Sequence, residues 1–254
     1  MIKSICVLGF LAWSFLSSIA YAQSVTDAVA SNLKPAYEEI FKGFSQSNPQ
    51  SKNIRVVYGS SGNLSSQMKH GAPYELFISA DEAYPLRLAE AGLTRDRGVV
   101  YASGHLALIA NTAAGLRLSS DPDSIQSLLR GAKKIAIANP DLAPYGKASV
   151  QYLQAIGLWD ELQSRVIFAE NISIAAVYVS TGAAKLGITA LSLAKSSELS
   201  QQIQYIALPD SLYAPIKQRM VLKRDPAPIA IGLYDYLQGP VAKQILRNNG
   251  YSVP

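Results

Sequence analysis

Hydrophobic and polar positions alternate along the chain in two ways, which predict strands that are followed by helices. Short apolar runs rich in β-branched residues indicate strands, and apolar positions that recur every three or four residues indicate helices. The predicted strands span residues 54–58, 76–79, 106–110, 134–138, 166–168, 186–190, 203–207 and 217–222. The predicted helices span residues 34–46, 64–70, 83–90, 124–129, 148–156, 174–181, 194–199 and 229–248. This alternation is typical of an α/β fold.

Four places where a strand-like run hands over to a helix share a distinctive local sequence. The first, AVASNLKPAYEEI, follows a short apolar run and places Ser31 and Asn32 before a helix. The second, YGSSGNL, carries Ser61. The third, ANPDLAPYGKAS, has Tyr145 after a proline, and the fourth, AENIS, has Ile172 just ahead of a helical pattern.

Each of these junctions would place unpaired backbone N–H groups and the positive end of a helix dipole beside a small polar group. Such a place binds an anion without a formal positive charge. The alternative is that the serines and asparagines are plain helix N-caps, because they are the preferred capping residues. Convergence of the four junctions on one cleft would favour an anion site, and the sequence leaves both interpretations open.

The first 22 residues predict a secretory signal peptide. Lys3 precedes an apolar stretch over residues 5–19, and the sequence Ala20-Tyr21-Ala22 then provides the small residues that signal peptidase accepts. The apolar stretch is short for a membrane span, and polar residues follow it at once. We therefore expect cleavage after Ala22 and export to a periplasm.

Composition narrows the class of protein further. The chain has 254 residues, 49% of them hydrophobic, and its single cysteine, Cys6, lies in the predicted signal peptide. The mature protein would then have no disulfide, thiol nucleophile or cysteine-bound metal, which fits an exported bacterial protein held together by its core. The net charge of +5 is spread along the chain, and without a block of like charges we expect no nucleic-acid partner.

Catalysis has little support in the sequence. A serine hydrolase would need the pattern G-x-S-x-G, and the stretch from Gly59 to Asn63 has its second glycine at the wrong position. His70 and His105 are the only histidines, and a predicted helix end and a predicted crossover give them structural roles. Histidines and carboxylates show no recognisable metal-ligand spacing. We expect neither an enzyme nor a cofactor.

Six motifs occur in the order found in one protein family. These are AVASNLKPA, YGSSGNL, GAPYELFISAD, ANPDLAPYGKAS, AENI and LGITALS, and YDYLQGPVAKQILRNNGY follows near the end. With these motifs the chain resembles periplasmic molybdate-binding proteins, the ModA-like substrate-binding subunits of ABC importers. The resemblance covers essentially the whole predicted mature chain.

The resemblance implies a two-lobed α/β periplasmic-binding-protein fold of type II, with a ligand cleft between the lobes. Residues 23–104 and 213–254 would form the first lobe, and residues 105–212 the second. We expect a monomer that docks on a membrane permease. In open α/β sheets, ligands lie beyond the carboxyl ends of strands, which is where the four junctions would fall.

The resemblance also implies a set of ligand-contacting residues. Ser31, Asn32 and Ser61 match positions in the first lobe, and Tyr145 matches the position after the proline in the second lobe. Ile172 matches a position that offers its backbone N–H. Part of the family has a tyrosine where this chain has Ala190, so Tyr145 becomes the candidate for that hydroxyl.

The function implied is high-affinity binding of molybdate, and of tungstate, by neutral hydrogen-bond donors and helix N-termini, with delivery to an ABC permease. A metal would enter only as the oxyanion, through the same five residues. Two alternatives stay open. The chain could bind another ligand, such as sulfate or ferric iron, or it could be an interaction module without a transport role.

Overall fold

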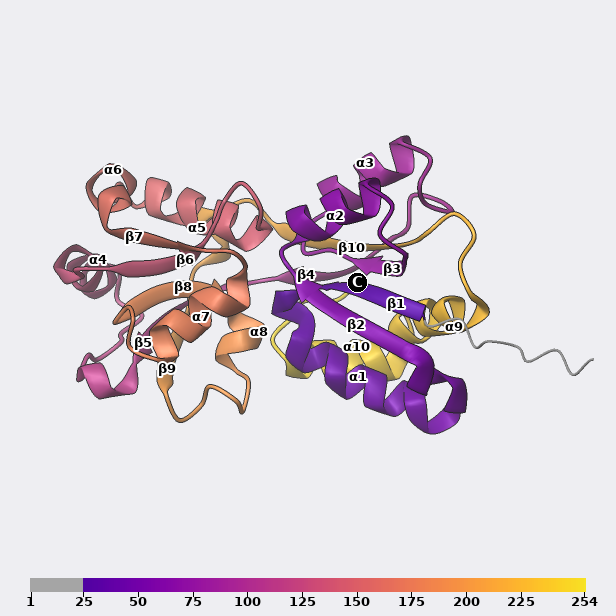
Figure 1. Cartoon of the computed structure of the whole chain (residues 1–254). Helices are drawn as coiled ribbons and strands as arrows, with labels where there is room; N and C mark the ends of the chain where they lie inside the picture. Colours follow the sequence, from indigo (N-terminus) through magenta and orange to yellow (C-terminus); the bar gives the residue numbers. More distant parts are fainter. Residues whose placement is uncertain (1–24) are drawn as a thin grey trace, which may run out of the picture.

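A computed structural model describes residues 25–254, and the expected signal peptide lies outside these residues. The strands form two sheets of five strands each (Figure 1). The first sheet contains β1 (Val25–Ala30), β2 (Ile54–Gly59), β3 (Tyr74–Ile78), β4 (Val99–Gly104) and β10 (Ile216–Leu222). The second contains β5 (Leu106–Asn111), β6 (Ile135–Ala138), β7 (Val166–Ala169), β8 (Leu186–Ala190) and β9 (Ile203–Ala207). Together with the helices, these sheets confirm the predicted α/β class.

The helices divide between the two sheets. Beside the first sheet lie α1 (Lys34–Ser47), α2 (Ser61–Lys69), α3 (Ala83–Glu90), α9 (Pro228–Leu237) and α10 (Pro240–Asn248) (Figure 1). Beside the second lie α4 (Pro122–Gly131), α5 (Pro144–Ala155), α6 (Trp159–Leu162), α7 (Ile172–Ser180) and α8 (Leu191–Ala194). Within the described chain, none of these helices has the length and apolar character needed to span a bilayer.

Both sheets are built to the same plan. In the first, with the order β2-β1-β3-β10-β4, β1 pairs in parallel with β2 and β3, and β10 runs antiparallel to both its neighbours. In the second, with the order β7-β6-β8-β5-β9, β6 pairs in parallel with β7 and β8, and β5 runs antiparallel to its neighbours. Three parallel strands in each sheet therefore end at the same edge, where ligands of open α/β sheets bind.

The chain passes between the two sheets twice. Strand β4 continues into β5 through His105, and β9 leads to β10 through residues 208–215. We propose that the chain divides into two lobes at these crossovers. Lobe 1 would comprise residues 23–104 and 213–254, and lobe 2 residues 105–212.

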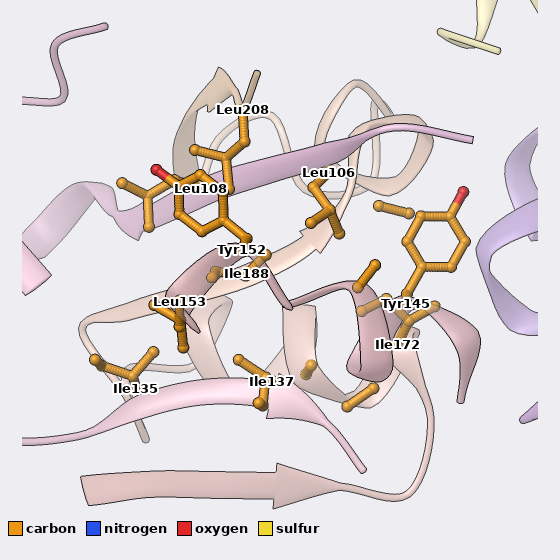
Figure 2. Packing of buried hydrophobic residues seen from close by; sticks show 14 of the residues in the cluster. Leu106, Leu108, Ile135, Ile137, Tyr145, Tyr152, Leu153, Ile172, Ile188 and Leu208 are labelled. Atoms are coloured by element: carbon orange, nitrogen blue, oxygen red, sulfur yellow. The ribbon is translucent and has the colours of Figure 1, made fainter. Parts of the chain in front are cut away.

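Each lobe is built around a hydrophobic core, and the core of lobe 2 also takes in four buried residues of lobe 1. The core of lobe 1 includes Leu76, Ile78 and Met220. The core of lobe 2, drawn in Figure 2, includes Tyr145 and Ile172 among its buried side chains. Tyr145 lies at one end of this cluster with its hydroxyl directed away from the other side chains (Figure 2). Two of the predicted site residues therefore rest on a packed core that fixes their positions.

Several elements differ from the sequence predictions, and two of them, β1 and α6, were not among the predicted strands and helices. Strand β4 was not predicted, and its hydrogen-bonding partner is β10, which lies far along the chain. The predicted helix over residues 229–248 is two helices, α9 and α10, because Pro240 lacks an N–H and cannot continue a preceding helix. The predicted helix over residues 194–199 is wrong: the helix is α8, which ends at Ala194, and the serines at 196 and 197 are weak helix formers.

Candidate functional site

A small cavity lies between the two lobes, and all five residues that the sequence singled out line it. Lobe 1 contributes Ala30, Ser31, Asn32, Gly59, Ser60, Ser61 and Ala80, and lobe 2 contributes Ala143, Pro144, Tyr145 and Ile172. The cavity between these walls is small, with a volume of about 10 Å³. Pockets for drug-sized ligands hold roughly 300–1,000 Å³. The cavity therefore suits a small ion.

Four helix starts meet at this cavity. Ser31 begins a short 3-10 turn (Ser31–Leu33) that runs directly into α1, and Ser61 is the first residue of α2. Tyr145 is the second residue of α5, and Ile172 is the first residue of α7. The first N–H groups of a helix have no acceptor within it and carry the positive end of its dipole. The structure thus brings together the four junctions that the sequence could not place relative to one another.

Ser61 has a hydroxyl hydrogen to give. Its Oγ accepts a hydrogen bond of 2.9 Å from the backbone N–H of Ala80, and the side chain is buried. Because Oγ acts there as an acceptor, its own hydrogen is left for another partner. The preceding Ser60 caps α2 instead, by accepting from the N–H of Asn63 at 3.4 Å.

Ser31 is held by the opposite lobe. Its Oγ accepts a long hydrogen bond of 3.4 Å from the backbone N–H of Ser173, and its carbonyl oxygen accepts from the Ser173 hydroxyl at 3.0 Å. Both bonds join the start of α1 to the start of α7. The hydroxyl hydrogen of Ser31, like that of Ser61, remains for another acceptor.

Asn32 is tied into the protein by its side chain. Its Nδ2 donates to Gln218 Oε1 at 3.1 Å and to the Tyr251 hydroxyl at 2.9 Å, and its carbonyl oxygen accepts from the Ser192 hydroxyl at 2.9 Å. Its Oδ1 is buried and has no hydrogen-bond partner within residues 25–254. Both side-chain hydrogens are therefore used, and the donor that Asn32 keeps for a ligand is the backbone N–H in the first turn of its helix.

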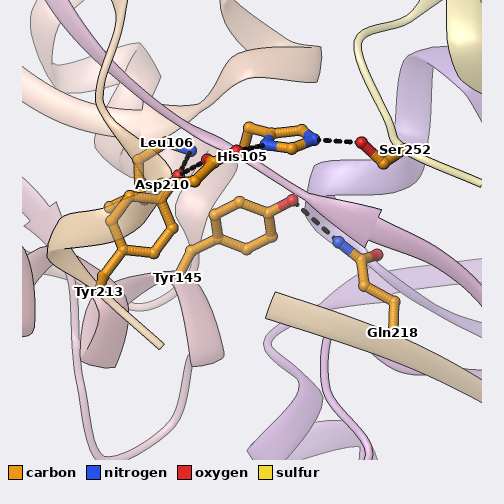
Figure 3. Close-up of polar contacts among 7 residues, drawn as sticks. All are labelled: His105, Leu106, Tyr145, Asp210, Tyr213, Gln218 and Ser252. Carbon is orange, nitrogen blue, oxygen red and sulfur yellow. Dashed lines mark hydrogen bonds and ion pairs between the residues drawn. The ribbon is translucent and has the colours of Figure 1, made fainter. Parts of the chain in front are cut away.

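Tyr145 is a neutral donor. Burial raises the pKa of its hydroxyl well above the ordinary value of 10.0, so the group stays protonated at any physiological pH. The hydroxyl oxygen accepts a hydrogen bond of 2.9 Å from Gln218 Nε2, as Figure 3 shows. Its own hydrogen is therefore left for another acceptor, and Tyr145 is one of the residues that line the cavity.

Ile172 contributes its backbone. The side chain of Asn171 caps α7 by accepting from the N–H groups of Ser173 and Ile174, both at 3.1 Å. The cap does not use the backbone N–H of Ile172, which therefore remains available to a ligand. The Ile172 side chain packs in the core of lobe 2. An apolar residue is thus compatible with a polar role at this position.

The lobes touch closely beside the cavity. The N–H of Gly62 donates to the carbonyl oxygen of Leu142 at 2.9 Å, and the Tyr84 hydroxyl donates to the carbonyl oxygen of Asp141 at 3.1 Å. A Cβ atom on Gly62 would lie 2.8 Å from that Leu142 oxygen. The lobes are therefore closed on one another, in a contact that only glycine allows.

Charged groups stand back from the cavity. None of the described residues that line it is charged. The carboxylate of Glu170 accepts from Asn63 Nδ2 at 3.1 Å, and Lys34 pairs with Glu198 at 3.4 Å, both between the lobes. Residues 25–254 also contain no group of three or more histidine, cysteine or acidic residues that could hold a metal ion. The cavity can bind an anion only through neutral donors and helix dipoles.

A serine, a histidine and an aspartate are in contact at the crossovers. His105 Nδ1 lies 2.9 Å from both carboxylate oxygens of Asp210, and Nε2 lies 2.9 Å from Ser252 Oγ (Figure 3). This order is that of a hydrolase triad. The backbone N–H groups of Gly250, Tyr251 and Ser252, however, each donate to a carbonyl oxygen of the fold, so they cannot form an oxyanion hole. The cluster ties the crossovers to the C-terminal segment.

The sequence analysis did not identify four polar residues near the cavity, namely Gln218, Ser173, Ser192 and Tyr251. Gln218 had a usable signal. In strand β10 it lies two residues from each of the buried residues Ile216 and Met220, on the same face of the strand. It is therefore a polar residue on an apolar face. Tyr251 and Ser192 meet Asn32 only through the tertiary fold, and no local pattern marks them.

Comparison with known proteins places these observations in a wider context. A family model described as "Bacterial extracellular solute-binding protein" matches residues 25–252. The molybdate-binding protein ModA of Azotobacter vinelandii is 33% identical over 242 residues, with 94% of this chain and 93% of the relative covered. ModA of Rhodobacter capsulatus is 31% identical over 239 residues, covering 91% and 89%. A solved structure of the A. vinelandii periplasmic molybdate-binding protein superposes with a TM-score of 0.80 at 30% identity, covering 91% of this chain and 99% of that one.

Proposed function

The chain belongs to the bacterial extracellular solute-binding protein family, as a ModA-like member, and from this premise we propose that it binds molybdate in the cavity between its lobes. One observation carries the proposal. Neutral hydrogen-bond donors at four helix starts converge on a small cavity, and among the described residues no charged side chain lines it.

The donors come from both lobes. Lobe 1 would supply the hydroxyls of Ser31 and Ser61, together with the backbone N–H groups of Asn32 and Ser61. Lobe 2 would supply the hydroxyl of Tyr145 and the backbone N–H groups of Tyr145 and Ile172. Each of these donors has either a hydrogen left over by its bonds within the protein or a place in the first turn of a helix.

Neutral donors suit a carrier. An oxyanion loses its water when the lobes close, and several hydrogen bonds must replace that hydration. A lysine or arginine in the cavity would add the attraction of a full opposite charge to its hydrogen bond with the anion, and so would hinder release. Tungstate has nearly the same size and charge as molybdate, and we propose that it binds in the same way.

We propose that closure of the two lobes around the anion links binding to transport. Because the cavity is lined by both lobes, an anion that contacts both stabilises the closed arrangement, as in other hinge closures around a ligand. We propose that the closed monomer, exported to the periplasm after loss of its signal peptide, docks on an ABC permease and releases the oxyanion there.

We propose that binding involves no covalent step and no ferric ion. Iron held by tyrosines requires phenolate oxygens, and burial raises the pKa of the Tyr145 hydroxyl, which disfavours that form. Ser252, the serine that contacts His105, is not among the described residues that line the cavity. The backbone N–H groups of residues 250–252 donate to carbonyl oxygens of the protein and are not available to a substrate.

Thermal unfolding of residues 23–254 with and without anions tests the proposal. A ligand present at 100 times its dissociation constant, and bound only by the folded state, adds about 2.7 kcal/mol of stability. We expect the unfolding temperature to rise with molybdate and tungstate, and to stay unchanged with sulfate, phosphate or ferric citrate. A rise with ferric citrate or sulfate alone, or with no anion at all, would contradict the proposal.

A further inference from the structure

Gln218 joins the two lobes behind the cavity. It lies on β10 in lobe 1, it is fully buried, and it is not one of the described residues that line the cavity. Its side-chain amide nevertheless contacts two residues that do line it, Asn32 of lobe 1 and Tyr145 of lobe 2. A buried amide in this position connects the two lobes of the site without touching its contents.

The direction of each bond decides which hydrogens remain available. Oε1 of Gln218 accepts from the Tyr101 hydroxyl at 2.7 Å and from Asn32 Nδ2 at 3.1 Å. Two donors therefore hold the oxygen end of the amide in lobe 1, and the nitrogen end faces Tyr145, to which it donates at 2.9 Å (Figure 3). Since a hydroxyl has one hydrogen, a tyrosine that accepts this bond can direct its hydrogen elsewhere.

The chain makes room for this contact at the crossover. Gly104 is the last residue of β4, and a Cβ atom there would lie 1.9 Å from the Tyr145 hydroxyl oxygen and 2.5 Å from Gln218 Nε2. Real Cβ atoms do not approach other atoms so closely. A glycine at this position thus lets Tyr145 reach past the strand that links the lobes and meet Gln218.

We propose that Gln218 is a positioning residue for the anion cavity, which donates to the Tyr145 hydroxyl and thereby aims its hydrogen at the bound anion. The inference rests on the proposed function, because the anion is the acceptor that the Tyr145 hydrogen would meet. The bond from Gln218 crosses between the lobes beside Gly104, at the segment that links them. Tyr145 is thereby held in lobe 2 by a residue of lobe 1, so its orientation depends on both lobes.

A double-mutant cycle tests whether Gln218 acts through Tyr145. The variants are Gln218→Met, which keeps the volume of the side chain but cannot donate, Tyr145→Phe, and the two combined. Molybdate affinity of each is measured by isothermal titration calorimetry. Because hydrogen bonds to charged groups are the strong ones, we expect each single variant to bind about tenfold more weakly or worse. The double variant should bind no more weakly than Tyr145→Phe alone, since Gln218 has nothing to aim once the hydroxyl is gone.

The outcomes separate the two proposals. If the wild-type protein binds no molybdate, the proposed function fails and this inference fails with it. If the wild type binds and Gln218→Met binds equally well, only the inference fails. Losses that multiply in the double variant would also overturn it, because a merely structural role would act independently of the Tyr145 hydroxyl.

A second route reaches the same bond should Gln218→Met not fold. Gly104→Ala places a methyl group against both the Tyr145 hydroxyl and Gln218 Nε2, and it should likewise weaken binding about tenfold. Gly131→Ala is the matched control, because nothing lies within 4 Å of the added methyl group. Wild-type affinity in Gly104→Ala would overturn the inference.

Discussion

Lobe 1 and lobe 2 serve the cavity by different means. Lobe 1 presents two serine hydroxyls, Ser31 and Ser61, at the starts of α1 and α2. Lobe 2 presents the backbone at the starts of α5 and α7, with one hydroxyl, that of Tyr145, which contacts Gln218 across the lobe boundary. Side-chain identity should therefore matter at most contact positions in lobe 1, and backbone geometry at most contact positions in lobe 2.

The difference teaches how a site without charges can still depend on closure. The donor residues of each lobe line a cavity whose other wall belongs to the other lobe. Neither lobe can replace the full hydration of an anion alone, so the affinity of the site depends on bringing both sets together. Three perturbations, in descending order of expected effect, would break or sharpen this comparison.

The largest expected effect concerns stability and is confined to lobe 1. Burial raises the pKa of Asp27, on β1 just before the site, from 3.8 to about 7, and nearby Glu75 adds to the rise, while a hydrogen bond from Tyr37 opposes it. Between pH 4 and 7 the unfolded chain loses this proton while the folded protein keeps it, so stability falls as pH rises and levels off above pH 7.

Asp27→Asn should remove this loss. Relative to the wild type, the variant should gain on the order of 3 kcal/mol in the free energy of unfolding between pH 4.5 and 7.5. Denaturant unfolding at the two pH values measures the difference, and Asp235→Asn, at an exposed position on α9, is the control. If the free energy of unfolding changed with pH in the same way for the wild type and for Asp27→Asn, the Asp27 carboxyl would not titrate in this range.

The second effect contrasts the two lobes directly. Ser61→Ala removes a side-chain donor in lobe 1, and we expect molybdate affinity to fall roughly ten- to a hundredfold, the usual cost of a hydrogen bond to a charged group. Ile172→Val keeps the backbone N–H in lobe 2 and should bind as the wild type does. Calorimetric titration of both, with Ser65→Ala one turn along α2 as the control, gives the comparison. Equal losses in Ser61→Ala and Ile172→Val would erase the distinction between the lobes.

The smallest effect concerns the contact between the lobes. Gly62→Ala places a Cβ atom 2.8 Å from the carbonyl oxygen of Leu142 in the other lobe. Because that oxygen belongs to the other lobe, opening should relieve the clash, so we expect closure to become less favourable and affinity to fall about tenfold, with thermal stability of the ligand-free protein little changed. Gly131→Ala again serves as the control. Unchanged affinity in Gly62→Ala would mean that the lobes need not come this close.

Much of the fold could be predicted because the periodic signals are local. The alternation of strands and helices and the crossover at His105 follow from apolar patterns and from residues such as Gly104. The break at Pro240 also has a local cause, although the predicted helix ran through it. Strand β4 carries a signal of the same kind in the apolar run over residues 99–102, and the sequence prediction missed it.

The candidate site could be anticipated only in part. Capping residues and turn sequences marked Ser31, Ser61 and Asn171 as helix starts, but whether the starts converge is a property of the tertiary fold. The partners of Asn32 show the limit most clearly. Its amide hydrogens go to Gln218 and Tyr251, each more than 180 residues away, and nothing in the local sequence could indicate this.

The most direct test of the central claim is to locate the metal. Crystals of residues 23–254 grown with molybdate can be examined by anomalous diffraction at the molybdenum absorption edge. We predict one strong peak in the cavity, with oxyanion atoms within hydrogen-bond distance of the Ser61 hydroxyl and the backbone N–H of Ile172. A peak elsewhere, or an empty cavity at molybdate concentrations that saturate the protein in solution, would contradict the account.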